Sequence, residues 1–318
     1  MYKKKNFLNI VFAGTSQFSA MHLQALLNAK YNIVLVLTKP DNLLGRRKKI
    51  IFSSVKTIAI KNSIPILQPK SLYEKDIQKI INSFYANMMI IVAYGCIIPK
   101  KIINLFKIGC INVHTSLLPR WRGASPIQSS ILKGEKKTGI SIILINEKLD
   151  EGDILISQSC CISRNETSFS LSNKLQFISI KLLKLILKKI IFKTFSKKPQ
   201  NNKYATYSKK INKKDALLNW NLPAIELERK IRAFNPWPIA YFEFNSIFIK
   251  VWEAEKINIS CSLPIGTIVK IDSKGLQINT KKEILSLKKI QFPGKKIINI
   301  QDLINSKKSF FSEGNKIF

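Results

Sequence analysis

Short apolar runs alternate with amphipathic stretches along the N-terminal half of the chain. The runs are rich in Ile, Val and Leu and end at Gly, Pro or polar turns, which is typical of buried strands. The pattern predicts strands at residues 8–13, 33–38, 64–67, 88–93, 110–114, 139–145 and 154–161, and helices at 18–29, 53–62, 75–84 and 126–132, with a further helix beginning at Pro99. Strands that alternate with helices build right-handed βαβ units, so we expect an α/β domain with a mainly parallel sheet.

A change of pattern then predicts a second domain. Residues 167–195 have the apolar spacing of a long helix with lysines between. Because this segment follows a strand, we expect it to pack on the sheet, and binding to a membrane surface is the alternative. Residues 196–207 have the composition of a linker. Beyond them, a helix within 215–233 and short strands near 240–244, 248–253, 266–271, 276–279 and 284–290 predict a small OB-like β-barrel. We therefore expect domains at residues 1–195 and 208–318.

The charge of the chain is strongly positive. Its 318 residues include 53 Lys+Arg against 19 Asp+Glu, a formal net charge of +34. Such a field attracts polyanions, with nucleic acid the first candidate and an anionic membrane surface the second. Lys, Ile, Asn and Phe all have A/T-rich codons, however, so compositional drift explains much of the excess. Arginine placement is the better guide, and three close pairs stand out: Arg46 with Arg47, Arg120 with Arg122, and Arg229 with Arg232.

The sequence gives no indication of a metal site, export or a membrane span. Five cysteines and two histidines occur without a C-x-x-C pair, which argues against zinc and fits free thiols in a reducing cytosol. Lysines 3–5 before the first apolar run resemble a signal peptide, but that run is short and leads into a strand-to-helix turn. No apolar run reaches the roughly 18–20 residues of a membrane span. We expect a cytoplasmic monomer without a metal, membrane or DNA partner.

Residues 110–127 carry the first candidate chemistry. Residues 110–114 read as a buried strand in which Asn112 and His114, two apart, face the same way. A loop with Pro119, Gly123 and Pro126 follows, at the carboxyl end where parallel sheets keep their sites. An amide donor beside an imidazole suits the stabilisation of a tetrahedral oxyanion. A core histidine at a strand end is the alternative, which the polar Asn112 on the same face makes less favourable.

Asp150 is the third candidate residue. It lies in a turn with Glu151, Gly152 and Asp153, where it could orient His114 or accept a proton. A solvated acidic turn between two strands is the alternative, and nothing in the sequence alone places Asp150 beside His114. The turn after the first strand, at Gly14, lacks G-x-G-x-x-G, so a dinucleotide is not indicated.

Several motifs resemble the 10-formyltetrahydrofolate-dependent formyltransferases. The likeness is carried by Asn112-Val113-His114, the segment 116–123, Asp150 with Gly152-Asp153, and three further motifs at residues 12–15, 92–95 and 232–238. It extends over nearly the whole chain and implies a Rossmann-like formyl-transfer domain followed by an OB-like domain. It also implies that Asn112 and His114 stabilise the oxyanion and that Asp150 assists His114 and proton removal. The implied folate contacts are Ser116, Leu117, Leu118, Pro119, Val92, Ala93 and Tyr94.

Within this family the chain is similar to the members that formylate the amino group of methionyl initiator tRNA. That resemblance gives the polar loop at 41–49 a role in binding tRNA. The expected tRNA contacts are Arg46, Arg47, Lys48, Lys49, Arg120 and Arg122. Paired arginines in a loop can bind phosphates. For the segment 41–49 the alternative is a solvated basic loop without a ligand. For residues 120–122 the alternative is a tryptophan that closes the loop of the site on the core.

The sequence leaves several rival functions open. One is a sister enzyme that formylates a glycinamide ribonucleotide or an amino-sugar nucleotide, and another is a hydrolase that releases formate. A non-catalytic RNA-binding protein and a membrane-surface protein complete the alternatives. The basic loop argues against a small substrate, and the intact Asn112, His114 and Asp150 argue against a non-catalytic protein. Thr115 stands where the family usually has Gly.

Overall fold

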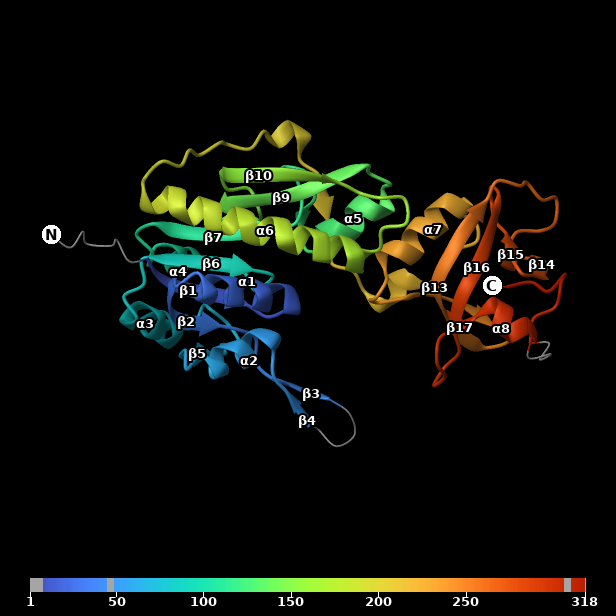
Figure 1. Cartoon of the computed structure of the whole chain (residues 1–318), viewed down its shortest axis with the longest axis horizontal. Coiled ribbons are helices and arrows are strands. Elements are labelled where there is room, and N and C mark those ends of the chain that lie inside the picture. The colour runs from blue at the N-terminus through green and yellow to red at the C-terminus, as the bar shows by residue number, and fades with distance from the viewer. Residues whose placement is uncertain (1–7, 45–48, 306–309, 318) are drawn as a thin grey trace. The chain divides into compact units, whose positions relative to one another are not determined.

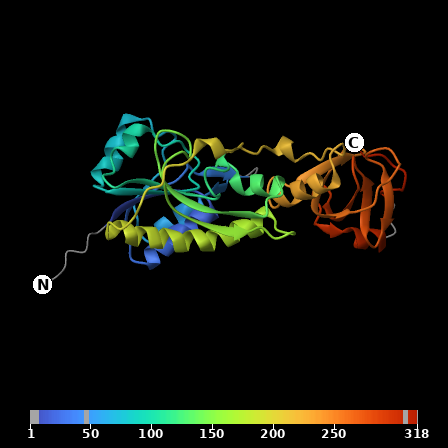
Figure 2. The same ribbon diagram turned by 90° about the horizontal axis from the view of Figure 1, so that it is seen from above.

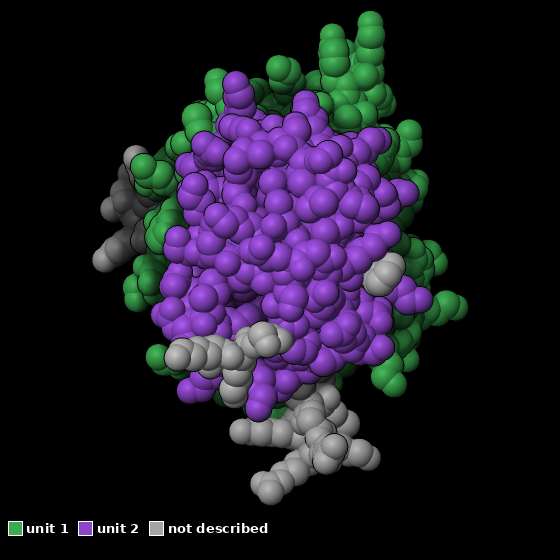
Figure 3. Space-filling view, turned by 90° about the vertical axis from the view of Figure 1, so that its right-hand side faces the viewer, with its two compact units in different colours: residues 1–126, 137–161, 172–208 green, residues 127–136, 162–171, 209–318 purple. Residues whose placement is uncertain are grey.

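The computed structural model describes residues 8–44, 49–305 and 310–317. The chain divides into two compact units, which Figure 3 distinguishes by colour. Unit 1 comprises residues 1–126, 137–161 and 172–208, and unit 2 comprises residues 127–136, 162–171 and 209–318. The second unit therefore includes two short segments that precede residue 172 as well as the C-terminal region.

Unit 1 is built on a seven-stranded sheet with the order β10-β9-β7-β6-β1-β2-β5. Its strands are β1 (Asn9–Gly14), β2 (Asn32–Leu37), β5 (Ile66–Leu67), β6 (Met88–Val92), β7 (Gly109–His114), β9 (Lys137–Leu144) and β10 (Ile154–Cys161). The pairs from β5 to β7 are parallel. Strands β9 and β10 continue the sheet antiparallel. The predicted α/β class with a mainly parallel sheet is confirmed for this unit.

Helices cover both faces of this sheet (Figures 1 and 2). They are α1 (Gln17–Asn28), α2 (Ser54–Lys61), α3 (Lys75–Ser83), α4 (Lys100–Ile103) and α6 (Ser168–Ile191), whereas α5 (Pro126–Leu132) belongs to unit 2 from residue 127 on. Ser53 caps α2 by accepting a hydrogen bond from the Lys56 N–H. On one face, buried residues of β1, β2 and β6 pack with α3 and α4 in a single cluster. A hydrogen bond between His22 and Ser179 joins α1 to α6, so the predicted long helix packs within the domain.

Two smaller pairings complete unit 1. β8 (Arg122–Gly123) pairs in parallel with β11 (Tyr207–Ser208), which follows the short helix η1 (Asn202–Tyr204). β3 (Asn42–Leu44) pairs antiparallel with β4 (Lys49–Ile51). The segment 41–49, predicted to be only a loop, therefore contains a strand pair at its ends.

Unit 2 contains an antiparallel sheet with the order β12-β13-β16-β15-β14, and β17 pairs with β16. The strands are β12 (Ala240–Phe244), β13 (Ile247–Ile257), β14 (Ile268–Asp272), β15 (Gly275–Asn279), β16 (Ile284–Gln291) and β17 (Ile298–Asn299). The other elements are η2 (Lys213–Ala216), α7 (Ala224–Ala233) and α8 (Ile300–Asn305). Helix α7 packs on β13 and β16 over a core that includes Trp220 and Phe242. The pairing of the described strands forms an open order, so the OB-like barrel stays a prediction.

None of the helices in the described ranges combines the length and the apolar composition that crossing a membrane requires.

Candidate active site

The candidate residues gather at one edge of the unit 1 sheet. Strands β1, β6 and β7 are parallel neighbours, so their carboxyl ends meet there. Asn112 pairs in register with Ile91 of β6, and His114 pairs with Ser141 of β9. The alternation of side chains along β7 therefore places Asn112 and His114 on one face at this edge, as the sequence predicts.

The structure brings Asp150 to these two residues. Asn112 Nδ2 donates to Asp150 Oδ1 at 3.2 Å, and the Gly123 N–H donates to Asp150 Oδ2 at 2.8 Å. His114 Nδ1 lies 3.5 Å from the same Oδ2. The side chains of His114 and Asp150 are 5% and 11% exposed, so bulk water does little to screen their interaction. The carboxylate thus accepts from two donors and faces the imidazole.

The second nitrogen of His114 fixes the tautomer of the ring. His114 Nε2 lies 2.9 Å from the carbonyl oxygen of Trp121. A carbonyl oxygen can only accept, so Nε2 carries the proton and donates it to this bond. Nδ1 is then directed at Asp150, and a proton on Nδ1 makes His114 an imidazolium between a carbonyl and a carboxylate.

Backbone conformation concentrates strain at this site. Ala93, Trp121 and Asp150 adopt left-handed φ values of 43°, 59° and 53°, which non-glycine residues rarely adopt. A Cβ on Gly152 would lie 1.6 Å from the Leu144 carbonyl oxygen. Only glycine can occupy that position, so the turn that presents Asp150 depends on it.

The loop after β7 is held by a buried serine. Ser141 Oγ accepts from the Leu118 N–H at 3.0 Å and donates to the Ser116 carbonyl at 2.8 Å. Ser141 itself is fully buried, so the two bonds fix the loop in place. Ser116 and Leu118 are buried, whereas Leu117 and Pro119 are half-buried. In this loop, a ligand could therefore reach mainly the side chains of Leu117 and Pro119 and the backbone.

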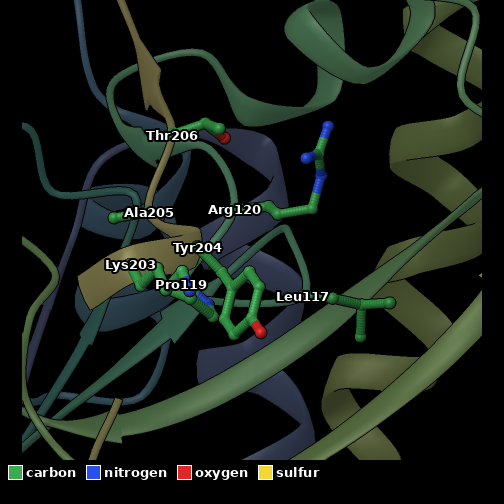
Figure 4. A pocket seen from close by; sticks show the side chains of 7 residues that line it. All are labelled: Leu117, Pro119, Arg120, Lys203, Tyr204, Ala205 and Thr206. Carbon is green, nitrogen blue, oxygen red and sulfur yellow. The ribbon is translucent and has the colours of Figure 1, made fainter. Parts of the chain in front are cut away.

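An open pocket of about 590 Å³ lies beside this loop (Figure 4). It is lined by Leu117, Pro119, Arg120, Lys203, Tyr204, Ala205 and Thr206. The lining combines apolar and aromatic surface with two cationic side chains. It therefore suits a flat, apolar ligand that carries an anionic group.

The turn after β6 reaches the same edge through its backbone. The Val92 carbonyl accepts a hydrogen bond from Ser19, and the Tyr94 carbonyl accepts one from Thr15 at 3.3 Å. The Tyr94 side chain is buried in the core cluster, where burial raises its pKa. Ala93 is exposed. Any ligand in this turn would contact Ala93 and main-chain atoms, and not the Tyr94 ring.

Cys110 lies in β7 close to the site but is not a nucleophile. The residue is fully buried, and burial raises the pKa of its thiol to about 12. The reactive thiolate is therefore scarce at neutral pH.

Arg122 differs from the other predicted tRNA contacts, because its side chain is buried. Its side chain is 1% exposed, and Nη1 pairs with Glu151 at 3.2 Å. Its Nε and Nη2 donate to Gln200 Oε1 at 3.1 and 2.9 Å, and Nη2 also donates to Asn202 at 2.7 Å. A guanidinium in this position cannot reach an RNA phosphate without breaking those bonds. Charge patterning in the sequence does not reveal this burial.

The other predicted cationic contacts differ in exposure and in whether the structure describes them. Arg120 is exposed and its guanidinium lies 5.3 Å from the centre of the Trp121 ring. Arg46, Arg47 and Lys48 lie outside the described residues. The backbone of Lys49 belongs to β4.

The segment that composition marks as a linker contributes to the site. Gln200 Nε2 donates to the carbonyls of Asp150 and Gly152 at 2.8 Å each. Thr206 Oγ1 accepts from the Trp121 N–H at 2.9 Å. Sequence reasoning missed both residues, because a run of amides and hydroxyls after a long helix has no feature that distinguishes a site wall from a linker.

Within the described ranges, no group of three or more His, Cys, Asp or Glu side chains is placed to hold a metal ion.

Comparisons with known proteins identify the family of the chain. The profile of the formyl transferase family matches residues 5–187, and that of the formyl transferase C-terminal domain matches residues 210–308. A methionyl-tRNA formyltransferase from Buchnera aphidicola of Acyrthosiphon pisum is 53% identical over 308 residues, which cover 96% of this chain and 98% of the relative. The protein of that name from Buchnera aphidicola of Schizaphis graminum is 53% identical over 311 residues, 98% of this chain and 99% of the relative.

Solved structures with low sequence identity share the fold. An N-formyltransferase from Helicobacter canadensis, solved in complex with folinic acid and dTDP-3-aminofucose, superposes with a TM-score of 0.64 at 20% identity. The match covers 88% of this chain and 99% of that one. Both family profiles and the near-complete coverage of relatives lead to one conclusion. The chain belongs to the formyl transferase family, and within it to the methionyl-tRNA formyltransferases.

Proposed function

We propose that this protein transfers the formyl group of 10-formyltetrahydrofolate to the free amino group of methionyl initiator tRNA, for bacterial-type translation initiation. The observation that carries the proposal is that Asn112 donates to the Asp150 carboxylate while His114 Nδ1 lies 3.5 Å from it, in a chain 53% identical to named methionyl-tRNA formyltransferases over nearly its whole length. The bond that forms joins the methionyl nitrogen to the formyl carbon. The bond that breaks joins that carbon to N10 of the folate, which leaves with a proton.

Asn112 supplies the donor to the formyl oxygen. Its amide has two N–H groups, and one of them is directed at Asp150. We assign the other to the oxygen on which negative charge develops during attack. A donor already fixed in place costs no reorganisation at the moment of reaction, and such a donor contributes roughly 10²–10³-fold to the rate.

His114 acts electrostatically on the reacting group. Both of its nitrogens face protein oxygens, Trp121 O and Asp150 Oδ2. Its polar ring lies in a poorly hydrated site, where it stabilises the developing oxyanion. Asp150 orients that ring and takes the proton that the attacking amine releases, so that the proton can pass to the departing N10.

The residues around the pocket fit the formyl donor. Leu117, Pro119 and Tyr204 give apolar and aromatic surface, whereas Arg120 and Lys203 give positive charge. A folate carries flat rings and ends in carboxylates, so we propose that its benzoylglutamate end occupies this pocket. The pterin would lie at the Val92, Ala93 and Tyr94 turn and at the backbone ahead of Asp150, with Ser116 and Leu118 supporting the loop between.

The tRNA contacts remain a proposal drawn from charge. We assign Arg46, Arg47, Lys48 and Lys49 to the acceptor end of the tRNA, joined by Arg120 at the site. Exposed arginines and lysines bind phosphates without sequence preference. Unit 2 would add the second contact surface.

The remaining features of the proposal concern organisation. Residues 1–195 would be the catalytic domain, 196–207 the connection, and 208–318 an OB-like tRNA-binding domain. We propose that the protein works as a cytoplasmic monomer.

An acceptor comparison tests this function. Purified protein and radiolabelled 10-formyltetrahydrofolate would be incubated with methionyl initiator tRNA, an amino-sugar nucleotide, glycinamide ribonucleotide or no acceptor. We expect label on the tRNA alone. Label on either small acceptor, or formate released without tRNA, would assign the chain to one of the rival functions.

A further inference from the structure

The segment 200–208 contacts the backbone of Asp150 and of Trp121 in the loop after β7. It follows α6 and is tied to the sheet just before Gln200, where the backbones of Lys198 and Ile154 exchange two hydrogen bonds of 2.9 Å. Its first contact with the site is made by the Gln200 side chain, and its last part forms β11 beside β8. The segment therefore contacts the Asp150 turn and the loop after β7 within nine residues.

The Gln200 amide is saturated on both sides. Nε2 donates its two hydrogens to the carbonyls of Asp150 and Gly152, each at 2.8 Å. Oε1 accepts from Nε and Nη2 of Arg122 at 3.1 and 2.9 Å. Four bonds to one amide leave it a single orientation, because a flipped amide would place donors against the guanidinium and an acceptor against carbonyls.

Arg122 holds Gln200 from the other side and is itself fixed. Its guanidinium is buried against Glu151 and Asn202. Its backbone N–H donates to the Thr206 carbonyl at 2.8 Å, and its carbonyl accepts from Ser208 at 3.2 Å. A buried guanidinium with these partners is costly to disturb, since a lost partner leaves a donor of a charged group without its acceptor.

The contacts of Gln200 and those of the Arg122 segment both reach Asp150. Gln200 binds the carbonyl of Asp150 itself, and Arg122 immediately precedes Gly123, whose N–H binds the Asp150 carboxylate. Asp150 has a strained left-handed φ of 53°, a conformation that persists only where surrounding contacts impose it. The two Gln200 bonds are contacts of that kind.

We propose that Gln200, oriented by Arg122, is a positioning residue that sets the Asp150 carboxylate against His114 and Asn112. The inference rests on the proposed function and adds that the segment 200–208 is a wall of the active site. Gln200 would affect turnover through Asp150, and its loss would leave substrate binding largely unchanged.

Two variants separate this role from a general effect on folding. Gln200→Ala removes all four bonds. Gln200→Glu keeps an acceptor for Arg122 but presents a carboxylate to the carbonyls of Asp150 and Gly152. Gln158→Ala is the matched control, because Gln158 is an exposed glutamine on β10 of the same unit. A misplaced catalytic group costs on the order of 10²-fold in rate, so we expect kcat to fall ~10–100-fold in both Gln200 variants, with KM for tRNA and folate within ~3-fold.

A double-mutant cycle gives the decisive result. If Gln200 acts through Asp150, the variant with both Gln200→Ala and Asp150→Asn should match Asp150→Asn alone within ~3-fold in single-turnover rate. A further ~10-fold loss in the double variant, or a Gln200→Glu variant as active as the control, would overturn the inference. An inactive parent protein would instead refute the proposed function, so the two failures are distinguishable. Thermal unfolding of each variant identifies any that does not fold, and Gln200→Glu then carries the comparison.

Discussion

Replacement of Asp150 by asparagine tests the hydrogen-bond geometry of the site with a change of a single atom. The Asp150 carboxylate accepts from Asn112 at 3.2 Å and from the Gly123 N–H at 2.8 Å, and it faces His114 Nδ1 at 3.5 Å. An amide presents one acceptor and one donor. One orientation places its NH₂ against the Gly123 N–H, and the other places it against the Asn112 NH₂.

The cost of this mismatch follows from those contacts. A flip of the Asn112 amide relieves its clash with the new NH₂ group, but the flip takes the Asn112 N–H away from the reacting group. The clash with the Gly123 N–H cannot be relieved in that way, because a backbone amide does not flip. A buried polar group without its partner costs about 1–3 kcal/mol, so we expect Asp150→Asn to lower the unfolding free energy by about that amount. Loss of a positioned proton acceptor should lower the single-turnover rate ~10²–10⁴-fold.

The assay is single-turnover formation of formyl-methionyl-tRNA, with thermal unfolding measured in parallel. Asp153→Asn is the matched control, because Asp153 lies in the same turn and supplies its backbone carbonyl to the Leu144 N–H. We expect that control to resemble the parent in both measurements. An Asp150→Asn protein that retained its rate within ~10-fold would refute the role of the carboxylate in proton transfer.

Three further predictions concern stability, RNA binding and thiol chemistry. Burial lowers the pKa of His22 from 6.5 to about 4, so between those pH values the folded protein binds fewer protons than the unfolded chain. The thermal midpoint should hold above pH 6.5 and fall as the pH drops toward 4, where the free energy of unfolding is lower by up to about 3 kcal/mol. A His22→Gln protein whose midpoint has the same pH slope would contradict this. Replacing Arg46 and Arg47 with alanine should weaken tRNA binding. The slope of log binding constant against log salt concentration should become shallower by the amount expected for up to about two lost phosphate contacts. An unchanged slope would mean that the loop does not contact phosphate. Iodoacetamide at pH 8 should label the exposed Cys161 and spare the buried Cys110, and equal labelling of both would contradict the raised pKa of Cys110.

Sequence periodicity was sufficient for the elements that hold the site. The apolar run at 110–114 gave β7, and its period of two gave the shared face of Asn112 and His114. The serine at the start of the second predicted helix proved to be its cap. These features are local, so residues close in the chain determine them.

The rest of the site depends on contacts between distant residues. Asp150 meets Asn112 across 38 positions, and Gln200 meets Asp150 across 50. Neither contact has a signature in periodicity or composition. Charge in the sequence also did not reveal the position of the Arg122 side chain. An arginine looks the same in a sequence whether its guanidinium lies in solvent or, as here, is buried against Gln200 and Glu151.

The central claim is that Asn112, His114 and Asp150 form the centre that formylates methionyl initiator tRNA. The most direct test compares the parent protein with His114→Ala in 10-formyltetrahydrofolate and charged initiator tRNA, with tRNA affinity measured on both. We predict that the parent makes formyl-methionyl-tRNA and that the variant binds the tRNA normally but turns over ~10²–10³-fold more slowly. A variant that formylates the tRNA at the parental rate would contradict the account.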